Sequence, residues 1–128
     1  MVAVPLQPRL GDKRPAVKRA LLLLLVCLLL VACGKHQPDV KINVTMKKYS
    51  IEPAEIRVKQ GQTVELTVST QDVQHGFYVP DLGIKEPIQK GKPAVIVFEA
   101  KKAGTYPVQC SIICGPGHDD MRGSIVVE

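Results

Sequence analysis

Apolar and polar residues alternate along several short stretches of the chain after residue 39. The alternation is clearest in segments 40–46, 55–59 and 63–70, where apolar side chains occupy about every second position. A period of two predicts half-buried β-strands, because a helix would repeat its apolar positions every three to four residues. Four further segments are rich in β-branched or aromatic residues and are also predicted as strands: 75–79, 94–100, 105–109 and 124–127.

Gly and Pro residues separate these seven predicted strands. Short strands at such spacing, without a ten-residue helical pattern among them, predict an all-β domain: an antiparallel Greek-key sandwich or barrel. Pro107 is unusual because it lies inside a predicted strand, where it predicts an edge position or a bulge. The 96 residues from Cys33 onward are enough to bury one hydrophobic core. We therefore expect a single domain over residues 40–128.

The first 32 residues differ in composition from the rest of the chain. Five basic residues lie in the first 19 positions, and residues 21–32 form an apolar run of twelve. A membrane-spanning helix needs about twenty apolar residues, so the pattern predicts a secretory signal peptide over 1–32. Residues 30–33 resemble the bacterial lipobox, which implies a lipidated Cys33 and a short tether over 33–39. A retained membrane anchor is the alternative.

The excess positive charge of the chain belongs to this leader segment. The whole chain has 17 basic and 12 acidic residues, a net charge of +5. Without residues 1–32, 12 basic and 11 acidic residues remain, so the domain is nearly neutral. A nucleic-acid partner is therefore not expected. The leader predicts an exported protein at the periplasmic or other extracytoplasmic face of a membrane, held there by lipid.

The four cysteine residues are divided between the leader and one loop near the C-terminus. Cys27 falls in the predicted signal peptide and Cys33 at the lipidation site, which leaves Cys110 and Cys114 as thiols. In an oxidising compartment two such cysteines often pair with each other. The spacing alone therefore leaves two alternatives open, a disulfide and a metal site.

The loop over residues 110–121 also contains His118 and Met121, among glycine and proline residues. Two thiolates, an imidazole and a thioether form a soft donor set that favours copper. His75 begins a predicted strand, and we expect it to lie beside the end of strand 105–109 and to complete the set. Two cysteines and two histidines also allow a structural zinc site.

The sequence around these residues resembles the binuclear copper A domain of cytochrome oxidase subunit II and the similar domain of nitrous oxide reductase. The resemblance covers nearly all of residues 33–128, including the turn at Gly61, the segments 75–79 and 104–106, and the final strand from Gly123. It implies a cupredoxin-like fold. It also implies a ligand set for two copper ions: Cys110 and Cys114 as bridging thiolates, His75 and His118 on one copper each, Met121 as axial ligand of the His75 copper, and the Ile112 main-chain carbonyl as the other axial ligand.

The resemblance further implies single-electron transfer without catalysis. The domain would be subunit II-like or a free-standing membrane-tethered carrier, with a redox protein such as cytochrome c or a membrane oxidase as partner. Cys114 distinguishes it from a mononuclear copper cupredoxin, which uses one cysteine. Copper delivery or storage and thiol–disulfide exchange are alternatives. The chain has no tryptophan, although subunit II uses a tryptophan-bearing surface for electron entry. We expect docking instead through an apolar rim that flanks His118, formed by Ile84, Ile112, Pro116 and the glycines beside His118.

Overall fold

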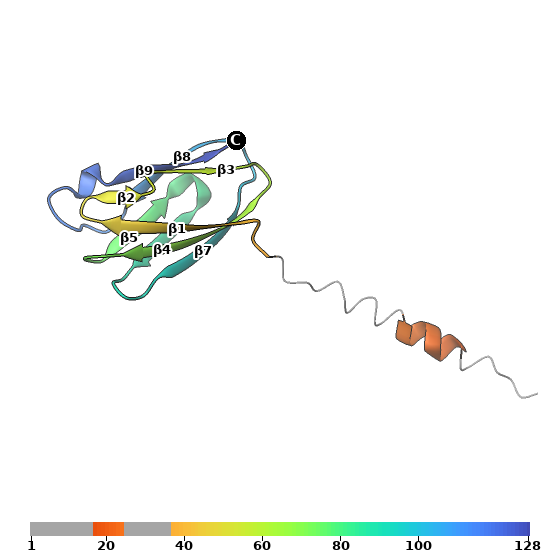
Figure 1. The fold of residues 1–128 in the computed structure, drawn as a ribbon. Helices are drawn as coiled ribbons and strands as arrows, with labels where there is room; N and C mark the ends of the chain where they lie inside the picture. The colour runs from red at the N-terminus through yellow and green to blue at the C-terminus, as the bar shows by residue number, and fades with distance from the viewer. Residues whose placement is uncertain (1–16, 25–36) are drawn as a thin grey trace, which may run out of the picture. The chain divides into compact units, whose positions relative to one another are not determined.

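The computed structural model describes residues 17–24 and 37–128 (Figure 1). Residues 17–24 are helical, and the remainder of the predicted signal peptide, together with Cys33, lies outside the described residues. Within the described ranges, no helix has the length and apolar character needed to cross a bilayer. Residues 37–128 form one compact unit.

Nine strands and two short 3-10 helices make up this unit. Their bounds are β1 Val40–Lys47, β2 Ser50–Glu52, β3 Glu55–Val58, β4 Thr63–Thr70, β5 His75–Val79, η1 Pro80–Leu82, β6 Ile84–Ile88, β7 Ala94–Glu99, β8 Gly104–Cys110, η2 His118–Asp120 and β9 Arg122–Val127. All seven predicted strands are present, so the all-β prediction is confirmed. The added strands are β2 and β6.

The strands form two facing sheets, visible in Figure 1 as the layer with β1, β4 and β7 and the layer with β3, β8 and β9. The strand orders are β2-β1-β4-β7 and β3-β9-β8-β5-β6. Most strand pairs are antiparallel, as predicted, but β1 pairs with β4, and β3 with β9, in parallel. Alternating hydrophobicity reports which face of a strand is buried, but it carries no information about strand direction.

The hydrophobic core lies between the two sheets. In β4 every second side chain is buried, as the alternation predicted. Its buried Leu66 belongs to the same core cluster as Met46 of β1 and Phe77 of β5, and all three are fully inaccessible to solvent. The alternation of apolar and polar residues therefore determines which face of each strand points into the core.

Two prolines mark irregular places in the second sheet. Pro87 lies inside the edge strand β6, opposite Gly76. Pro107 lies in β8, which is interior to the sheet, yet the pairing of β8 with β5 covers only Gln109 and Cys110. No residue of β5 therefore pairs with Pro107, as expected for a residue without an N–H donor.

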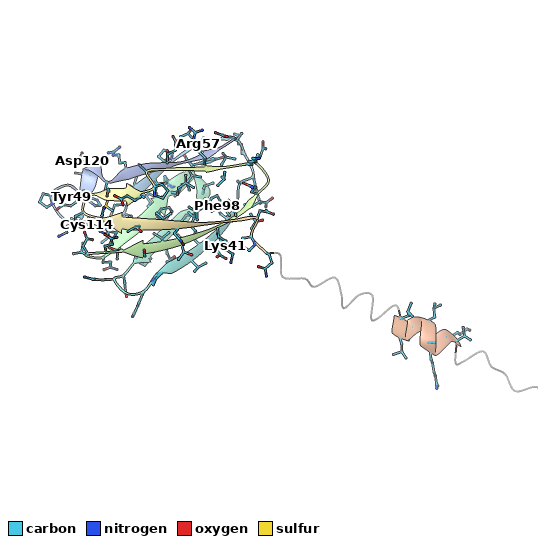
Figure 2. The ribbon with its side chains drawn as sticks, viewed as in Figure 1. Lys41, Tyr49, Arg57, Phe98, Cys114 and Asp120 are labelled. Atoms are coloured by element: carbon cyan, nitrogen blue, oxygen red, sulfur yellow. The ribbon has the colours of Figure 1, made fainter. Side chains whose placement is uncertain are left out.

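Several strands end or begin at one end of the sandwich, which we call the ligand pole. The parallel pair β1 and β4 runs from Val40 opposite Val64 to Met46 opposite Thr70. Because β5 and β8 are antiparallel, the start of β5 and the end of β8 lie at this same pole. Figure 2 shows the labelled Tyr49, Cys114 and Asp120 at one end of the domain, and Lys41 and Phe98 toward the other.

Candidate metal centre

The register of two strands brings the predicted ligands together. Phe77 of β5 pairs with Cys110 of β8, so His75, two residues before Phe77, projects from the same face beside the ligand loop. The loop is held at both ends, since the Ser111 N–H donates to the Gly76 carbonyl (3.0 Å) and the Cys110 N–H donates to the Met121 carbonyl (3.3 Å). The expectation that His75 meets this loop is therefore confirmed.

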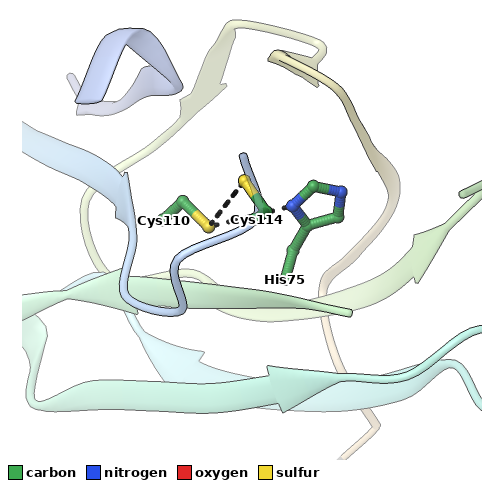
Figure 3. Close-up of side chains that lie close together, drawn as sticks. All are labelled: His75, Cys110 and Cys114. Carbon is green, nitrogen blue, oxygen red and sulfur yellow. Dashed lines mark hydrogen bonds between the residues drawn. The ribbon is translucent and has the colours of Figure 1, made fainter. Parts of the chain in front are cut away.

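Every predicted donor lies within 4.0 Å of a cysteine sulfur. Around the Cys110 Sγ these donors are His75 Nδ1 at 3.8 Å, the Ile112 carbonyl oxygen at 3.1 Å and Cys114 Sγ at 4.0 Å. Around the Cys114 Sγ they are His118 Nδ1 at 3.8 Å and Met121 Sδ at 3.9 Å. Figure 3 shows the two sulfurs facing each other and the His75 ring nitrogen directed toward them.

These separations suit a shared metal ion. A first-row ion binds nitrogen at about 2.0 Å and sulfur at about 2.3 Å, so two ligands in tetrahedral positions lie about 3.5–3.8 Å apart. The ligand atoms of His75, Cys110 and Cys114 all lie within 4.8 Å of one another. A cavity of about 110 Å³ adjoins Cys110, His118 and Met121. The donor chemistry fits copper, which accepts thiolate, imidazole and thioether together.

Cys110 and Cys114 are free thiols in this structure. Their sulfur atoms, 4.0 Å apart, are well beyond the roughly 2.05 Å of a disulfide bond. Burial raises the pKa of the Cys114 thiol, and the neighbouring Cys110 reinforces this shift. Without a metal, Cys114 therefore stays protonated at neutral pH, and an incoming ion must displace its proton.

His75 is fully buried and its orientation is fixed by Asp72. The His75 Nε2 lies 2.8 Å from the Asp72 Oδ1, so a proton on Nε2 donates to the carboxylate and Nδ1 faces Cys110. A carboxylate behind a metal-binding histidine selects the tautomer and makes the free nitrogen a better ligand. Asp72 was not predicted from the sequence as part of the site. Its only signal was a carboxylate three residues before a candidate ligand, within the polar segment 70–74.

The Asp72 carboxylate also accepts hydrogen bonds from the main chain. The Lys48 N–H donates to Oδ2 and the Val73 N–H to Oδ1, both at 2.7 Å. Partial burial would raise the pKa of Asp72, but these two bonds and the interaction with His75 outweigh it and hold the pKa below its usual range. Asp72 is therefore a carboxylate at neutral pH and connects the β1–β2 turn to His75.

Gly76 is required by the close approach of the ligand loop to β5. A Cβ atom at this position would lie 2.2 Å from the Ser111 Oγ and 3.1 Å from the Ile112 nitrogen. Only a residue without a side chain allows the loop to pass this close to the strand. Gly76 therefore contributes to the site by permitting the Ser111–Gly76 hydrogen bond.

The apolar rim predicted around the site needs one correction. Ile84 pairs with Val79 at the end of β5 remote from His75, so it does not flank the ligands. Ile113 lies at the tip of the loop instead, with 85% of its surface exposed. The sequence pattern does not reveal the pairing of β6 with β5, which places Ile84 at the far end of that strand pair.

Comparison with known proteins identifies the same architecture elsewhere. Residues 20–127 match the family model described as "Cupredoxin-like domain". Cytochrome c oxidase subunit 2 of Thermostichus vulcanus is 34% identical over 99 residues, which are 70% of this chain and 30% of that protein. Nitrous-oxide reductase of Stutzerimonas stutzeri is 32% identical over 93 residues, again 70% of this chain but 15% of that protein. The chain thus spans less than a third of either relative.

A solved structure supports the fold. The periplasmic domain of subunit II of cytochrome oxidase from Bradyrhizobium japonicum superimposes with a TM-score of 0.67 at 23% sequence identity. The match covers 74% of this chain and 88% of that domain. At this identity the likeness establishes the sandwich architecture.

Proposed function

Because the chain belongs to the cupredoxin-like domain family and is homologous to cytochrome c oxidase subunit II and nitrous-oxide reductase, we propose that it binds a binuclear copper A centre and transfers single electrons. The observation that carries the proposal is the clustering of all six donors around the two cysteine sulfurs at 3.1–4.0 Å. Such a centre shares one unpaired electron between two copper ions.

The proposed ligand assignment is the one that the resemblance to copper A domains implies. Cys110 and Cys114 would both contribute thiolates to the two ions. His75 and Met121 would hold one ion, and His118 and the Ile112 carbonyl would hold the other. Asp72 holds His75 with Nδ1 toward the ion, and the flanking strands hold the loop. A rigid ligand frame suits electron transfer because little structure has to change between oxidation states.

Four alternatives fit the site less well. Copper delivery favours exchangeable ligands, but His75 is fully buried and Cys110 is only 7% exposed. Thiol–disulfide exchange proteins of the thioredoxin type alternate helices and strands, whereas the described domain consists of strands with two single-turn helices. A zinc site or a mononuclear copper site leaves part of the six-donor set unused. We further propose that the domain is an electron relay without a substrate site of its own.

Copper loading of the full chain, purified in detergent, tests this function. We expect two copper ions per chain and an electron paramagnetic resonance spectrum with the multiline hyperfine pattern of one electron shared by two nuclei. The matched control is Cys114→Ser, for which we expect at most one copper and a four-line pattern. One copper or one zinc in the unaltered chain, or a disulfide that refuses metal, would refute the proposal.

We also propose that the chain is exported and lipid-anchored through Cys33. The support is the lipobox-like sequence and a tether of about seven residues, which spans at most about 25 Å. The variant Cys33→Ser should leave the membrane fraction, whereas Cys27→Ser should stay in it. Membrane retention of Cys33→Ser would instead indicate an uncleaved anchor.

The proposed partner is a redox protein such as cytochrome c or a membrane oxidase. The support is the subunit II identity of the relatives and the exposed apolar Ile113 beside the ligand Cys114. Ile113→Lys should slow electron transfer with a candidate donor, and Val97→Lys, exposed on β7 opposite Glu65 of β4, should not. Equal rates for both variants would contradict docking at this tip.

A further inference from the structure

Tyr49 lies along the glycine residues of the ligand loop. Gly115 and Gly117 stand between Cys114 and His118 in the sequence. A Cβ atom at Gly117 would lie 2.5 Å from the Tyr49 Cδ2 and 2.6 Å from its Cγ, and one at Gly115 would lie 2.3 Å from the Tyr49 hydroxyl oxygen. The tyrosine ring therefore covers the backbone of residues 115–117 from its base to its tip.

The two glycines are needed for different reasons. Gly115 has a φ of 144°, a conformation that other residues rarely adopt, so its backbone alone favours glycine. Gly117 has a φ of −96°, which any residue adopts. The requirement for glycine at Gly117 therefore comes from the contact with Tyr49, which makes this position a specific probe of the contact.

The turn that carries Tyr49 is fixed from the other side of the site. The Lys48 N–H donates to the Asp72 Oδ2 at 2.7 Å, and the Asp72 Oδ1 lies 2.8 Å from the His75 Nε2. The β1–β2 turn is thus hydrogen-bonded through Lys48 to Asp72, which in turn contacts His75. The same turn packs the ring of Tyr49 against the ligand loop. Figure 2 shows Tyr49 and Cys114 at the same end of the domain.

We propose that Tyr49 is a positioning residue that fixes residues 115–117 against the β1–β2 turn, so that Cys114 and His118 keep their 3.8 Å separation before metal arrives. The contact is one-sided, since 36% of the Tyr49 surface remains exposed. The proposal rests on the proposed function in that Cys114 and His118 are taken as ligands. The packing itself involves protein atoms alone and is measurable in the metal-free chain.

Amide hydrogen exchange of the metal-free chain tests the packing. The His118 N–H donates to the Gly115 carbonyl and the Asp120 N–H to the Gly117 carbonyl. Removing the ring by Tyr49→Ala should accelerate exchange at both amides about tenfold or more, while Tyr49→Phe, which keeps the ring, should leave it nearly unchanged. Lys48→Ala is the matched control, because it alters an exposed side chain of the same turn and retains the main-chain bond to Asp72.

A double substitution tests the contact directly. Gly117→Ala alone should accelerate exchange at His118, because the new methyl group and the base of the Tyr49 ring occupy the same space. In the Tyr49→Ala background the same substitution should add no further acceleration, since the opposing atoms are gone. Additive effects of the two substitutions, or a Tyr49→Ala chain that exchanges like the unaltered one, would overturn the proposal.

Copper loading supplies a second readout. Copper should leave Tyr49→Ala for a chelator about tenfold faster than it leaves Tyr49→Phe, because the ligand loop is less well held. If amide exchange in Tyr49→Ala equals that of the unaltered chain, and the unaltered chain forms a two-copper centre, the role of Tyr49 is rejected and the proposed function stands. If amide exchange is faster in Tyr49→Ala but the unaltered chain binds no copper, the packing role of Tyr49 is supported and the proposed function is rejected.

Discussion

Asp72 and His75 are joined by a 2.8 Å contact between a carboxylate oxygen and Nε2, and the opposite ring nitrogen of His75 faces Cys110 at 3.8 Å. The imidazole is fully buried. A buried ring with two nitrogens needs a partner for each. The carboxylate supplies one of them, and the other nitrogen is left for a metal.

Removal of the Asp72 carboxylate should weaken metal binding. Asp72→Ala deprives both His75 Nε2 and the Lys48 N–H of their partner, so copper affinity should fall about 10- to 100-fold. The metal-free fold should lose about 1–3 kcal/mol. Competition with a chelator and urea unfolding measure the two effects. Asp72→Asn, which keeps an acceptor oxygen, should fall between Ala and the unaltered chain, and a loss as large as that of Ala would contradict this.

The stability of the metal-free chain should depend on pH through the same carboxylate. The pKa of Asp72 is lowered in the folded state, so its contribution is complete above the unfolded value of about 3.9 and is lost as the pH falls below it. The difference in unfolding free energy between the unaltered chain and Asp72→Asn should therefore be larger at pH 7 than at pH 3. Urea titrations at both pH values decide this, and equal differences would refute it.

Substitution of Gly76 should displace the ligand loop. In Gly76→Ala the methyl group would lie 2.2 Å from the Ser111 Oγ, which should cost about 1–3 kcal/mol of stability and lower the yield of copper-loaded protein. Ser111→Gly in the same chain removes the nearest clashing atom and should restore part of both losses. Thermal unfolding and metal counting provide the measurements. If Ser111→Gly restores neither stability nor copper loading in Gly76→Ala, the clash with Ser111 is not the cause of the losses.

Met121 should affect the copper spectrum more than the fold. Its side chain is almost fully buried, so Met121→Leu, which conserves volume, should cost less than about 1.5 kcal/mol. Because the Sδ lies 3.9 Å from the Cys114 Sγ and is proposed as an axial ligand, the hyperfine pattern should nevertheless change. Met46→Leu, buried in the core of β1, is the control. An unchanged spectrum in Met121→Leu would make Met121 a core residue only.

The sequence allowed prediction of strands that have one buried and one more exposed face, such as β4, because their apolar and polar residues alternate. It also allowed prediction of the loop ligands, because these residues lie close together in the sequence. It did not reveal β6, because an edge strand that contains Pro87 and charged residues has no alternating pattern. It also did not reveal Asp72 or Tyr49 as parts of the site. Tyr49 meets glycines far along the chain, and Asp72 meets Lys48 across 24 positions; such proximity depends on the strand register, which hydrophobicity does not encode. The contact of Asp72 with His75 is local, but it depends on how the polar segment between β4 and β5 folds.

The direction of β1 has a practical consequence. This strand enters the domain at Val40, beside Val64, and reaches the ligand pole only at Met46, beside Thr70; at about 3.3 Å per residue this is a path of about 20 Å. A chain fixed to an electrode through its N-terminal segment would therefore present the ligand pole to the solution. Electrons from the surface would have to cross the length of the sandwich, whereas a dissolved donor would meet the ligand loop directly.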